Sequence, residues 1–455
     1  MREVLKFIMG GYAMNQKILF SPIGGTDPIS NFRDGAMLHI LRVYKPDIVY
    51  IYLSKEMCVY QDKDNRYLYC IERLEKLLNH KFQVHELKRP ELINVHEYDY
   101  FYKDFNDIIS DIKSKHQYST LYLNVSSGTP AMKSALQMMA SISEYRMIPI
   151  QVSTPVKGIN LHYENRDNYE VEEYWELNED NVENFENRCI ESRGDNQLAA
   201  IKKGVINNHI DSYDYVAALQ ISKSIKDFVC DDLFILLRAA SYRLQLDFSG
   251  IDKLLNSTDY DILPIKDWNR KIILEYLLCL RIKLKREEYS DFIRAITPII
   301  AELFELVLKK QCNIGINTYS TIKRNRNNVF IRRWDRKKLA NNPDLLRVLD
   351  DHFNGRILEN PIASYHLSVI IDAYCNHEKT KNTVEDLSNV EQKVRNLAAH
   401  EIISVTDEWI KSNTGFTSEE IINKLKYLSK MCSFTITKDL WDSFDKMNLL
   451  IKQQL

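Results

Sequence analysis

The sequence predicts a Rossmann-like α/β domain with a parallel sheet, followed by a remainder that is all α-helical. Short apolar runs alternate with amphipathic stretches over residues 17–153, a rhythm typical of parallel strands with helices on both faces. From residue 196 onward, apolar residues recur at helical spacing almost throughout. The chain also has only 13 Gly and 11 Pro among 455 residues, which favours a helix-rich architecture with few elaborate loops.

The elements follow in order. Strands are predicted at 17–20, 47–53, 82–87, 120–125 and 147–152, with helices between them at 33–43, 67–78, 101–114 and 131–143. A doubly wound sheet of order 3-2-1-4-5 would place the first and fourth strands side by side at the topological switch point. Residues 170–195 contain ten acidic and two basic residues, and we interpret them as a solvated linker or an exposed helix face. Later helices are predicted at 213–226, 232–245, 268–285, 289–310 and 390–404.

The length of the chain suits about three domains of ~150 residues. We predict an α/β domain over residues 1–168, a helical connecting domain over 169–286 and a helical bundle over 287–455. The first 13 residues are short, basic and apolar, and we interpret them as an extension rather than a signal peptide, because a strand-like segment starts at Lys17. Met14 offers an alternative start.

Composition narrows the class of protein. The net charge is -2, so any nucleic-acid binding must come from a local patch. The eight cysteines are scattered without a C-x-x-C pair, which argues against structural zinc and a disulfide framework and favours a cytoplasmic location. No apolar run reaches the ~18 residues of a membrane span. Neither G-x-G-x-x-G nor G-x-x-x-x-G-K-[ST] occurs, so a dehydrogenase and a P-loop NTPase are disfavoured.

Two polar loops follow the first and fourth predicted strands, at residues 21–31 and 124–132. In the second loop, Thr129 is a natural N-cap and Pro130 suits the first helical position. Gly128 lets a ligand approach the backbone, and the helix N-terminus offers N–H groups to a phosphate. Both loops flank the predicted switch point, where such folds bind ligands. Ordinary capped turns are the alternative interpretation.

A short motif near the end of the chain combines Arg395, Asn396 and His400 on one predicted helix. Arg can hold a phosphate and its developing charge, and His can move protons near neutral pH. Asn396 and His400 stand four residues apart and share a helix face. Arg347 and His352 repeat the spacing, but we interpret them as a chance match, because Asp350 and Asp351 would repel a phosphate. The alternatives are an ordinary helix histidine and an ion pair between Arg395 and Glu391.

Together, the G-T-D-P loop, the N-x-S-S-G-T-P-x-M loop and the C-terminal R-N-x-x-A-H motif resemble the CARF–HEPN ribonucleases of type III-A CRISPR systems. The resemblance implies a CARF domain that binds a cyclic oligoadenylate, and a helical HEPN bundle that then cuts single-stranded RNA without a metal. It implies an activator pocket and a ribonuclease site. The pocket would contain Gly25, Thr26, Asp27, Asn124, Ser126, Ser127, Gly128 and Thr129, and the ribonuclease site Arg395, Asn396 and His400.

The resemblance further implies cyclic hexaadenylate as the activator in preference to the tetramer, with no other cofactor. The expected partners are a second copy of the chain, single-stranded RNA and the ring, with no DNA and no membrane. Some members of the family also cut their own activator slowly in the CARF pocket, where Thr129 would position the ribose-phosphate. One chain supplies one such His, and acid–base catalysis is easiest with two groups, so chemistry also favours a two-fold dimer.

Two other functions stay open at this point. A nucleotide-sensing regulator would bind the ring without cutting RNA, and would not need the Arg395–His400 pair. An ungated HEPN toxin would use the first domain only as a scaffold, and the two polar loops argue against it. A basic stretch over 323–338, with Phe330 and Trp334 interleaved, is either a guide for RNA or an exposed loop and helix face.

Overall fold

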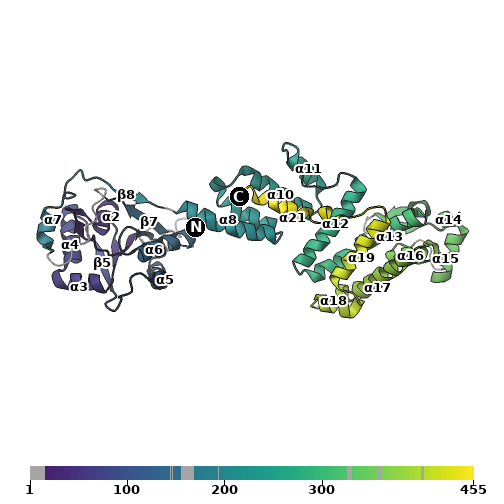
Figure 1. The fold of residues 1–455 in the computed structure, drawn as a ribbon, viewed down its shortest axis with the longest axis horizontal. Helices are drawn as coiled ribbons and strands as arrows, with labels where there is room; N and C mark the ends of the chain where they lie inside the picture. Colours follow the sequence, from purple (N-terminus) through teal and green to yellow (C-terminus); the bar gives the residue numbers. More distant parts are fainter. Residues whose placement is uncertain are drawn as a thin grey trace, which may run out of the picture. The chain divides into compact units, whose positions relative to one another are not determined.

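The computed structural model describes residues 16–143, 145, 147–154, 169–192, 194–324, 330–355, 360–400 and 404–455, and of residues 394–400 it describes the backbone alone. The chain divides into two compact units, Met1–Ile201 and Lys202–Leu455 (Figure 1). Each unit is described separately. The three predicted domain boundaries stay a prediction.

The first unit is built on a six-stranded sheet. Five strands are parallel, namely β1 (Lys17–Pro22), β4 (Ile48–Leu53), β5 (Gln83–Lys88), β6 (Thr120–Asn124) and β7 (Met147–Val152). A short strand, β8 (Cys189–Glu191), adds antiparallel to β7. The order β5-β4-β1-β6-β7-β8 confirms the predicted order of the five parallel strands. β1 and β6 are therefore neighbours, and the chain winds away from them in both directions.

Helices cover both faces of this sheet (Figure 1). One apolar layer includes Leu41 of α2 (Ala36–Tyr44) and Leu74 of α4 (Arg66–Leu78). The other includes Phe105 of α5 (Tyr98–Lys115) and Leu136 of α6 (Pro130–Ile142). The predicted helix at 33–43 starts later than expected, because residues 29–34 form a small hairpin, β2 (Ile29–Ser30) and β3 (Arg33–Asp34). Its turn residues Asn31 and Phe32 have left-handed φ angles of 50° and 54°, as a tight hairpin turn requires.

The acidic segment was interpreted as a solvated linker or an exposed helix face; it is not a linker, although Glu172, Glu173 and Glu176 of its helix are exposed. It forms α7 (Val171–Glu176), a loop and strand β8 within the first unit. Asp180 and Arg188 in that loop are buried. Arg188 Nη2 donates to Asp180 Oδ2 over 2.9 Å, and the same carboxylate oxygen accepts the backbone N–H of Asp34 over 2.9 Å. Partners from distant parts of the chain thus compensate the burial of these charges.

The second unit is helical, as predicted. Its principal elements are α8 (Asp195–Asp211, which begins in the first unit), α9 (Tyr215–Lys223), α10 (Asp231–Leu244), α11 (Phe248–Leu255), α12 (Trp268–Lys285), α13 (Tyr289–Gln311), α15 (Pro343–Phe353), α16 (Ser364–Tyr374), α17 (Glu378–His400), α18 (Asp407–Thr414), α19 (Ser418–Met431) and α21 (Ser443–Lys452). The long helix α13 contacts α12, α16, α17 and α19, and its apolar face is buried, including Leu303 and Phe304. This makes α13 the centre of the core of the second unit.

Within the described residues of the second unit, 320–324 and 330–334 depart from the helical pattern. Strands β9 (Ser320–Arg324) and β10 (Phe330–Trp334) form an antiparallel hairpin, followed by the short helix α14 (Arg336–Leu339). The two strands include residues 323–324 and 330–334 of the basic stretch, for which the sequence left two interpretations open, a guide for RNA or an exposed loop and helix face. None of the helices in the described part of the chain combines the length and the apolar character needed to cross a bilayer.

Candidate functional site

The two polar loops meet at the carboxyl ends of β1 and β6. A Cβ atom added to Gly24 would lie 2.7 Å from the backbone nitrogen of Gly128, so the two loops are in direct backbone contact. Gly128 has φ +85°, and a Cβ there would lie 2.8 Å from Met132 Sδ and 3.0 Å from Pro22 Cβ. Both the conformation and the space at Gly128 therefore require glycine.

A pocket of about 260 Å³ opens beside this contact. Three of the predicted ligand residues line it, namely Gly25, Gly128 and Thr129. The other side is formed by α3 (Lys55–Asp64) and the residue before it, which contribute Ser54, Glu56, Met57 and Tyr60. The pocket lies at the switch point of the sheet, where ligands bind in this architecture. The remaining lining residues are Ile23, Gly24, Val95, Pro130 and Met132.

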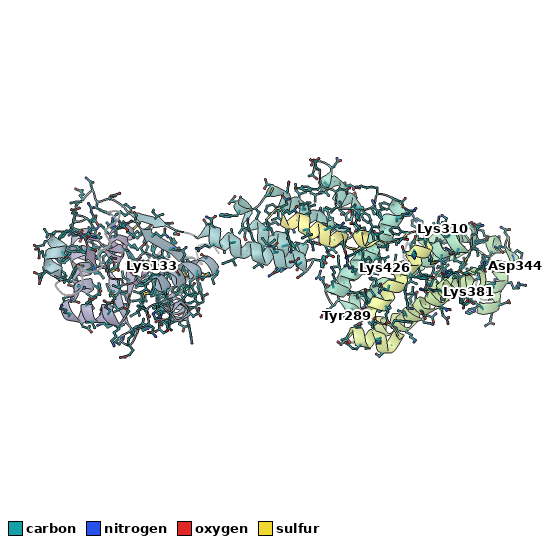
Figure 2. The ribbon with its side chains drawn as sticks, viewed as in Figure 1. Lys133, Tyr289, Lys310, Asp344, Lys381 and Lys426 are labelled. Atoms are coloured by element: carbon teal, nitrogen blue, oxygen red, sulfur yellow. The ribbon has the colours of Figure 1, made fainter. Side chains whose placement is uncertain are left out.

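Asp27 does not line the pocket but supports the first loop from inside. Its side chain is buried, and its carboxylate accepts the backbone N–H groups of Gly24 over 3.0 Å and Met37 over 3.1 Å. Burial raises the pKa of Asp27, and the Ser127 hydroxyl, the two backbone N–H groups and Lys133 oppose that rise. Lys133 lies on α6 and is labelled in Figure 2.

Asn124, Ser126 and Ser127 also lie outside the pocket lining, as does Thr26. Asn124 is fully buried. Its Nδ2 donates to Ser21 Oγ over 2.9 Å, and its Oδ1 accepts the backbone N–H groups of Ser126 and Ser127 over 3.0 and 3.2 Å. Ser126 Oγ accepts the backbone N–H of Val152 over 2.7 Å. These side chains hold the second loop in shape and tie it to β1 and β7.

Thr129 caps α6, as the sequence predicted. Its Oγ1 accepts the backbone N–H of Met132 over 3.4 Å and donates to the carbonyl of Val95 over 2.6 Å, while Pro130 occupies the first helical position. Val95 belongs to the loop that follows β5, so Thr129 joins the loops after the third and fourth parallel strands. The loops after β1, β4, β5 and β6 therefore all reach the pocket.

Arg395, Asn396 and His400 lie in the last turns of α17, whose backbone is helical through His400. Their side chains lie outside the described residues, as do residues 401–403 of the helix predicted at 390–404. The helical backbone places Asn396 and His400 one turn apart on one face, and Arg395 about 140° round from His400.

α17 begins twelve residues before the predicted start at residue 390. It is anchored upstream of the motif by Leu387 and Val390, both fully buried. Glu391 is also buried, and it accepts a hydrogen bond from Ser364 Oγ of α16. Buried contacts therefore fix the position of α17 one turn before Arg395.

The second match to the Arg–His spacing has an ordinary structural role. Arg347 Nη2 lies 3.6 Å from Asp344 Oδ1, an exposed ion pair on α15 (Asp344 is labelled in Figure 2). The carboxylate of Asp350 accepts two hydrogen bonds from the guanidinium of Arg336, over 2.8 and 2.7 Å. His352 has its ring 4.7 Å from that of Phe353. These contacts support the interpretation of this match as coincidental.

Within the described residues, one group has the spacing of metal ligands: Asp34, His39 and Asp180 in the first unit. Arg42 donates to both oxygens of Asp34 over 2.6 and 3.0 Å, and Arg188 donates to Asp180. Burial alone would raise the pKa of Asp34, but hydrogen bonds from His39 and Arg42 and the Arg42 charge outweigh it and lower the pKa to about 2. Two guanidinium groups thus occupy the positions that a cation would take, and the cluster stabilises the fold.

Comparison with known proteins gives a consistent result along the chain. The Cas_Csm6 CARF domain matches residues 86–189, the CRISPR-associated protein Csm6 6H domain matches 192–244, and the Cas_Csm6 HEPN domain matches 262–452. The chain is 29% identical over 440 residues to the CRISPR system endoribonuclease Csm6 of Mycobacterium tuberculosis, covering 96% of this chain and 98% of the relative. It is 32% identical over 300 residues to the Streptococcus thermophilus protein of the same name, covering 65% of this chain and 67% of that protein.

Among solved structures, Enterococcus italicus Csm6 bound to cyclic hexa-2'-fluoro-hexa-dAMP aligns with a TM-score of 0.66. The alignment covers 97% of this chain and 100% of the other at 20% identity. At that identity the structural likeness shows a common fold.

Proposed function

This chain belongs to the Csm6 family of CRISPR system endoribonucleases, and from that premise we propose that it is a single-stranded RNA endonuclease switched on by a cyclic oligoadenylate in type III antiviral defence. The observation that carries the proposal is the presence, in one chain, of a backbone-lined pocket at the switch point and a helix with the Arg395–His400 motif. The pocket would bind the activator, and the helix would cleave the RNA.

The pocket supports the binding of a nucleotide ring. Gly24, Gly25 and Gly128 leave backbone uncovered by side chains, and the N-terminus of α6 favours an anion. The volume of about 260 Å³ lies below the range of about 300–1,000 Å³ for small-molecule sites, so each copy of the chain would hold part of a ring. A two-fold dimer would present two such pockets to a ring with two-fold symmetry. We propose the hexamer as activator, in line with the six-membered ring analogue to which the Enterococcus italicus relative is bound.

The RNA itself supplies the nucleophile, its 2′-OH. Attack on the adjacent phosphate breaks the P–O5′ bond and gives a 2′,3′-cyclic phosphate and a 5′-OH. Arg395 would stabilise the negative charge on the phosphoryl oxygens, in the role that a metal ion has in other nucleases. His400 would transfer a proton, and Asn396 would orient His400 or a ribose. Two copies of α17 facing each other in a dimer would supply both an acid and a base.

The proposal includes slow cutting of the activator in the same pocket. The ring has 2′-OH groups of its own, and Thr129 stands where the loops after β5 and β6 meet. Incubation of the ring with His400→Ala protein, followed by chromatography, should yield linear fragments although RNA stays intact. If the ring stays intact, the proposed cleavage of the activator is refuted, but the proposed cleavage of RNA is not affected.

Cleavage of a fluorescent single-stranded RNA in EDTA, with cyclic tetra- or hexaadenylate or neither, tests the proposed function. We expect cleavage with the hexamer only, and His400→Ala should lower the rate by about 10²–10⁴-fold, the usual contribution of an acid–base group. His352→Ala is the matched control, because it removes the other His of the repeated spacing, and it should cut like wild type.

Three outcomes would contradict the proposal at different points. No cleavage with either ring, by folded dimeric protein, would refute the gated nuclease. Cleavage without a ring would indicate an ungated enzyme. Cleavage that disappears in EDTA would refute the metal-independent chemistry.

A further inference from the structure

The basic stretch of the second unit separates into two halves in the structure. The half nearer α14 is engaged in the fold. Arg332 binds Glu305 of α13 and Asn317, and Lys338 Nζ donates to the carbonyl of Ser320 over 2.7 Å. Trp334 is fully buried, so it cannot stack on a base. Together with the Arg336–Asp350 pair, these contacts assign this half to stabilising the base of the hairpin.

The outer half of the β9–β10 hairpin has a different character. Phe330 is 63% exposed and Ile322 is 69% exposed, although apolar side chains of this size are usually covered. Phe330 pairs with Arg324 across the strands, and Arg324 Cζ lies 4.6 Å from the centroid of the Phe330 ring. Lys323 is exposed as well and pairs with Ile331. The outer half thus combines an exposed aromatic ring with adjacent cations.

The charge of this segment is one-sided. Residues 320–334 contain five Lys or Arg and no Asp or Glu, in a chain whose 61 basic residues are outnumbered by 63 acidic ones. A polyanion is the partner that this charge favours. An aromatic face with adjacent cations suits single-stranded nucleic acid in particular, because bases stack on the ring while phosphates bind the cations.

The base of the hairpin is linked to the helix of the catalytic motif. β10 bonds to the segment before α16, with Trp334 N–H donating to the Asn360 carbonyl over 3.0 Å and Ile362 N–H donating to the Arg332 carbonyl over 3.1 Å. Ser364, the first residue of α16, donates to Glu391 of α17. Glu391 precedes Arg395 by four residues, about 6 Å along the axis. α16 and α17 also pack together, as Figure 1 shows.

We propose that the outer half of the hairpin, formed by Ile322, Lys323, Arg324 and Phe330, guides the RNA substrate toward the catalytic helix. One base stacks on Phe330, and the flanking phosphates contact Lys323 and Arg324. The proposal rests on the endoribonuclease activity of the family, but not on the identity of the activator. It concerns substrate affinity and leaves the cutting chemistry to α17.

Binding of a labelled single-stranded RNA, followed by fluorescence anisotropy, tests this directly. The His400→Ala background keeps the RNA intact, so binding is measured even if gating or cutting differs from the proposal above. We expect Phe330→Ala to weaken binding about fivefold or more, the usual effect of losing one stacked base. Lys323→Ala/Arg324→Ala should lower the slope of log affinity against log salt by about 1.4, or ~0.7 for each phosphate contact.

The matched control is Lys309→Ala/Lys310→Ala, which removes two exposed cations at the end of α13 in the same unit (Lys310 is labelled in Figure 2). It should leave affinity and salt slope as in the background. Wild-type affinity and slope in both hairpin variants would overturn the proposal. So would hairpin variants that keep RNA binding but lose dimerisation by sedimentation, because the patch would then join two copies of the chain.

Discussion

Buried polar side chains, rather than exposed ones, shape the pocket of the first unit. Asp27 binds two backbone N–H groups of its own loop region, and Asn124 joins the second loop to Ser21 of the first strand. Leaving such groups without partners would cost about 1–3 kcal/mol each, so the native loop shape is strongly preferred. The pocket is then lined by glycine backbone and by side chains from α3.

Residue identity alone could not separate these two roles. Asp27, Asn124 and Ser127 were predicted as ligand residues because the resemblance to the CARF–HEPN ribonucleases assigns them to the pocket by their positions in the two polar loops. The structure turns these side chains inward. Conversely, Ser54 was missed, although it directly follows the second strand at the same edge of the sheet. That position was the available signal.

His366 should give the second unit a pH-dependent stability. It is buried among Trp334, Phe353 and Tyr365, its Nδ1 accepts the backbone N–H of Ala363, and burial lowers its pKa to about 4. The unfolded chain binds a proton as pH falls below about 6.5, whereas the folded chain does not until about pH 4. The contribution of His366 to the free energy of unfolding is therefore fully present above pH 6.5 and is lost as the pH falls from 6.5 to 4.

Urea unfolding of wild type and His366→Asn at pH 7 and pH 5 checks this. Asn keeps an acceptor but does not titrate, so the gap in unfolding free energy between the two proteins should narrow by roughly 2 kcal/mol at the lower pH. A gap that stays constant would show that His366 does not titrate as described.

At the scale of elements, the N-terminus of α6 connects the fold to the pocket. Thr129 caps the helix, bonds to the loop after β5 and lines the pocket. The cap fixes the direction in which the N–H groups of the first turn point. Loss of the hydroxyl should therefore affect stability and ligand binding together.

Thr129→Val keeps the shape of the side chain and removes the hydroxyl. We expect the first unit to lose about 1–2 kcal/mol, the usual cost of a lost cap, and the ring to bind more weakly. Thr129→Ser retains both hydrogen bonds and should resemble wild type. Thermal unfolding measures the stability, and calorimetric titration with cyclic hexaadenylate measures the affinity for the ring. If Thr129→Val matches Thr129→Ser in both stability and affinity, the proposed role of the cap is refuted.

Element by element, continuous apolar strands were the easiest to predict. β1, β4 and β6 are buried on both faces, which produces unbroken apolar runs. β8 was missed because it has three residues, of which two are exposed. α3 was missed because it is largely polar and buries only Met57, Cys58 and Gln61. The burial of the acidic segment was missed because its partners lie far away in the sequence: Arg42 donates to Asn181, and Asn178 donates to Asp34.

At the scale of the whole molecule, each unit has a core of its own. In the second unit, Arg243 of α10 binds both oxygens of Glu275 of α12, over 2.7 and 2.9 Å, and donates to Ser443 of α21 over 2.8 Å. All three residues are buried. Arg243 lies in the part matched by the 6H domain and Glu275 in the part matched by the HEPN domain. A buried ion pair is costly to separate, so these two parts should respond to the activator together.

The central claim is that the pocket at Gly128 controls the nuclease at His400. The most direct measurement is the concentration of cyclic hexaadenylate that gives half-maximal RNA cleavage, compared between Gly128→Ala and Gly415→Ala. Both glycines have a left-handed φ, +85° and +88°, but a Cβ at Gly415 meets nothing within 4 Å, whereas one at Gly128 meets Met132 and Pro22. The backbone strain of about 1–2 kcal/mol is thus matched, and the two variants differ in the steric overlap that the new Cβ creates beside the pocket.

We expect Gly128→Ala to need at least about tenfold more ring, which corresponds to 1.4 kcal/mol of lost binding free energy. Gly415→Ala should respond like wild type. Equal ring requirements in the two variants would contradict the account, because the loops at Gly24 and Gly128 would then not be the site through which the activator acts.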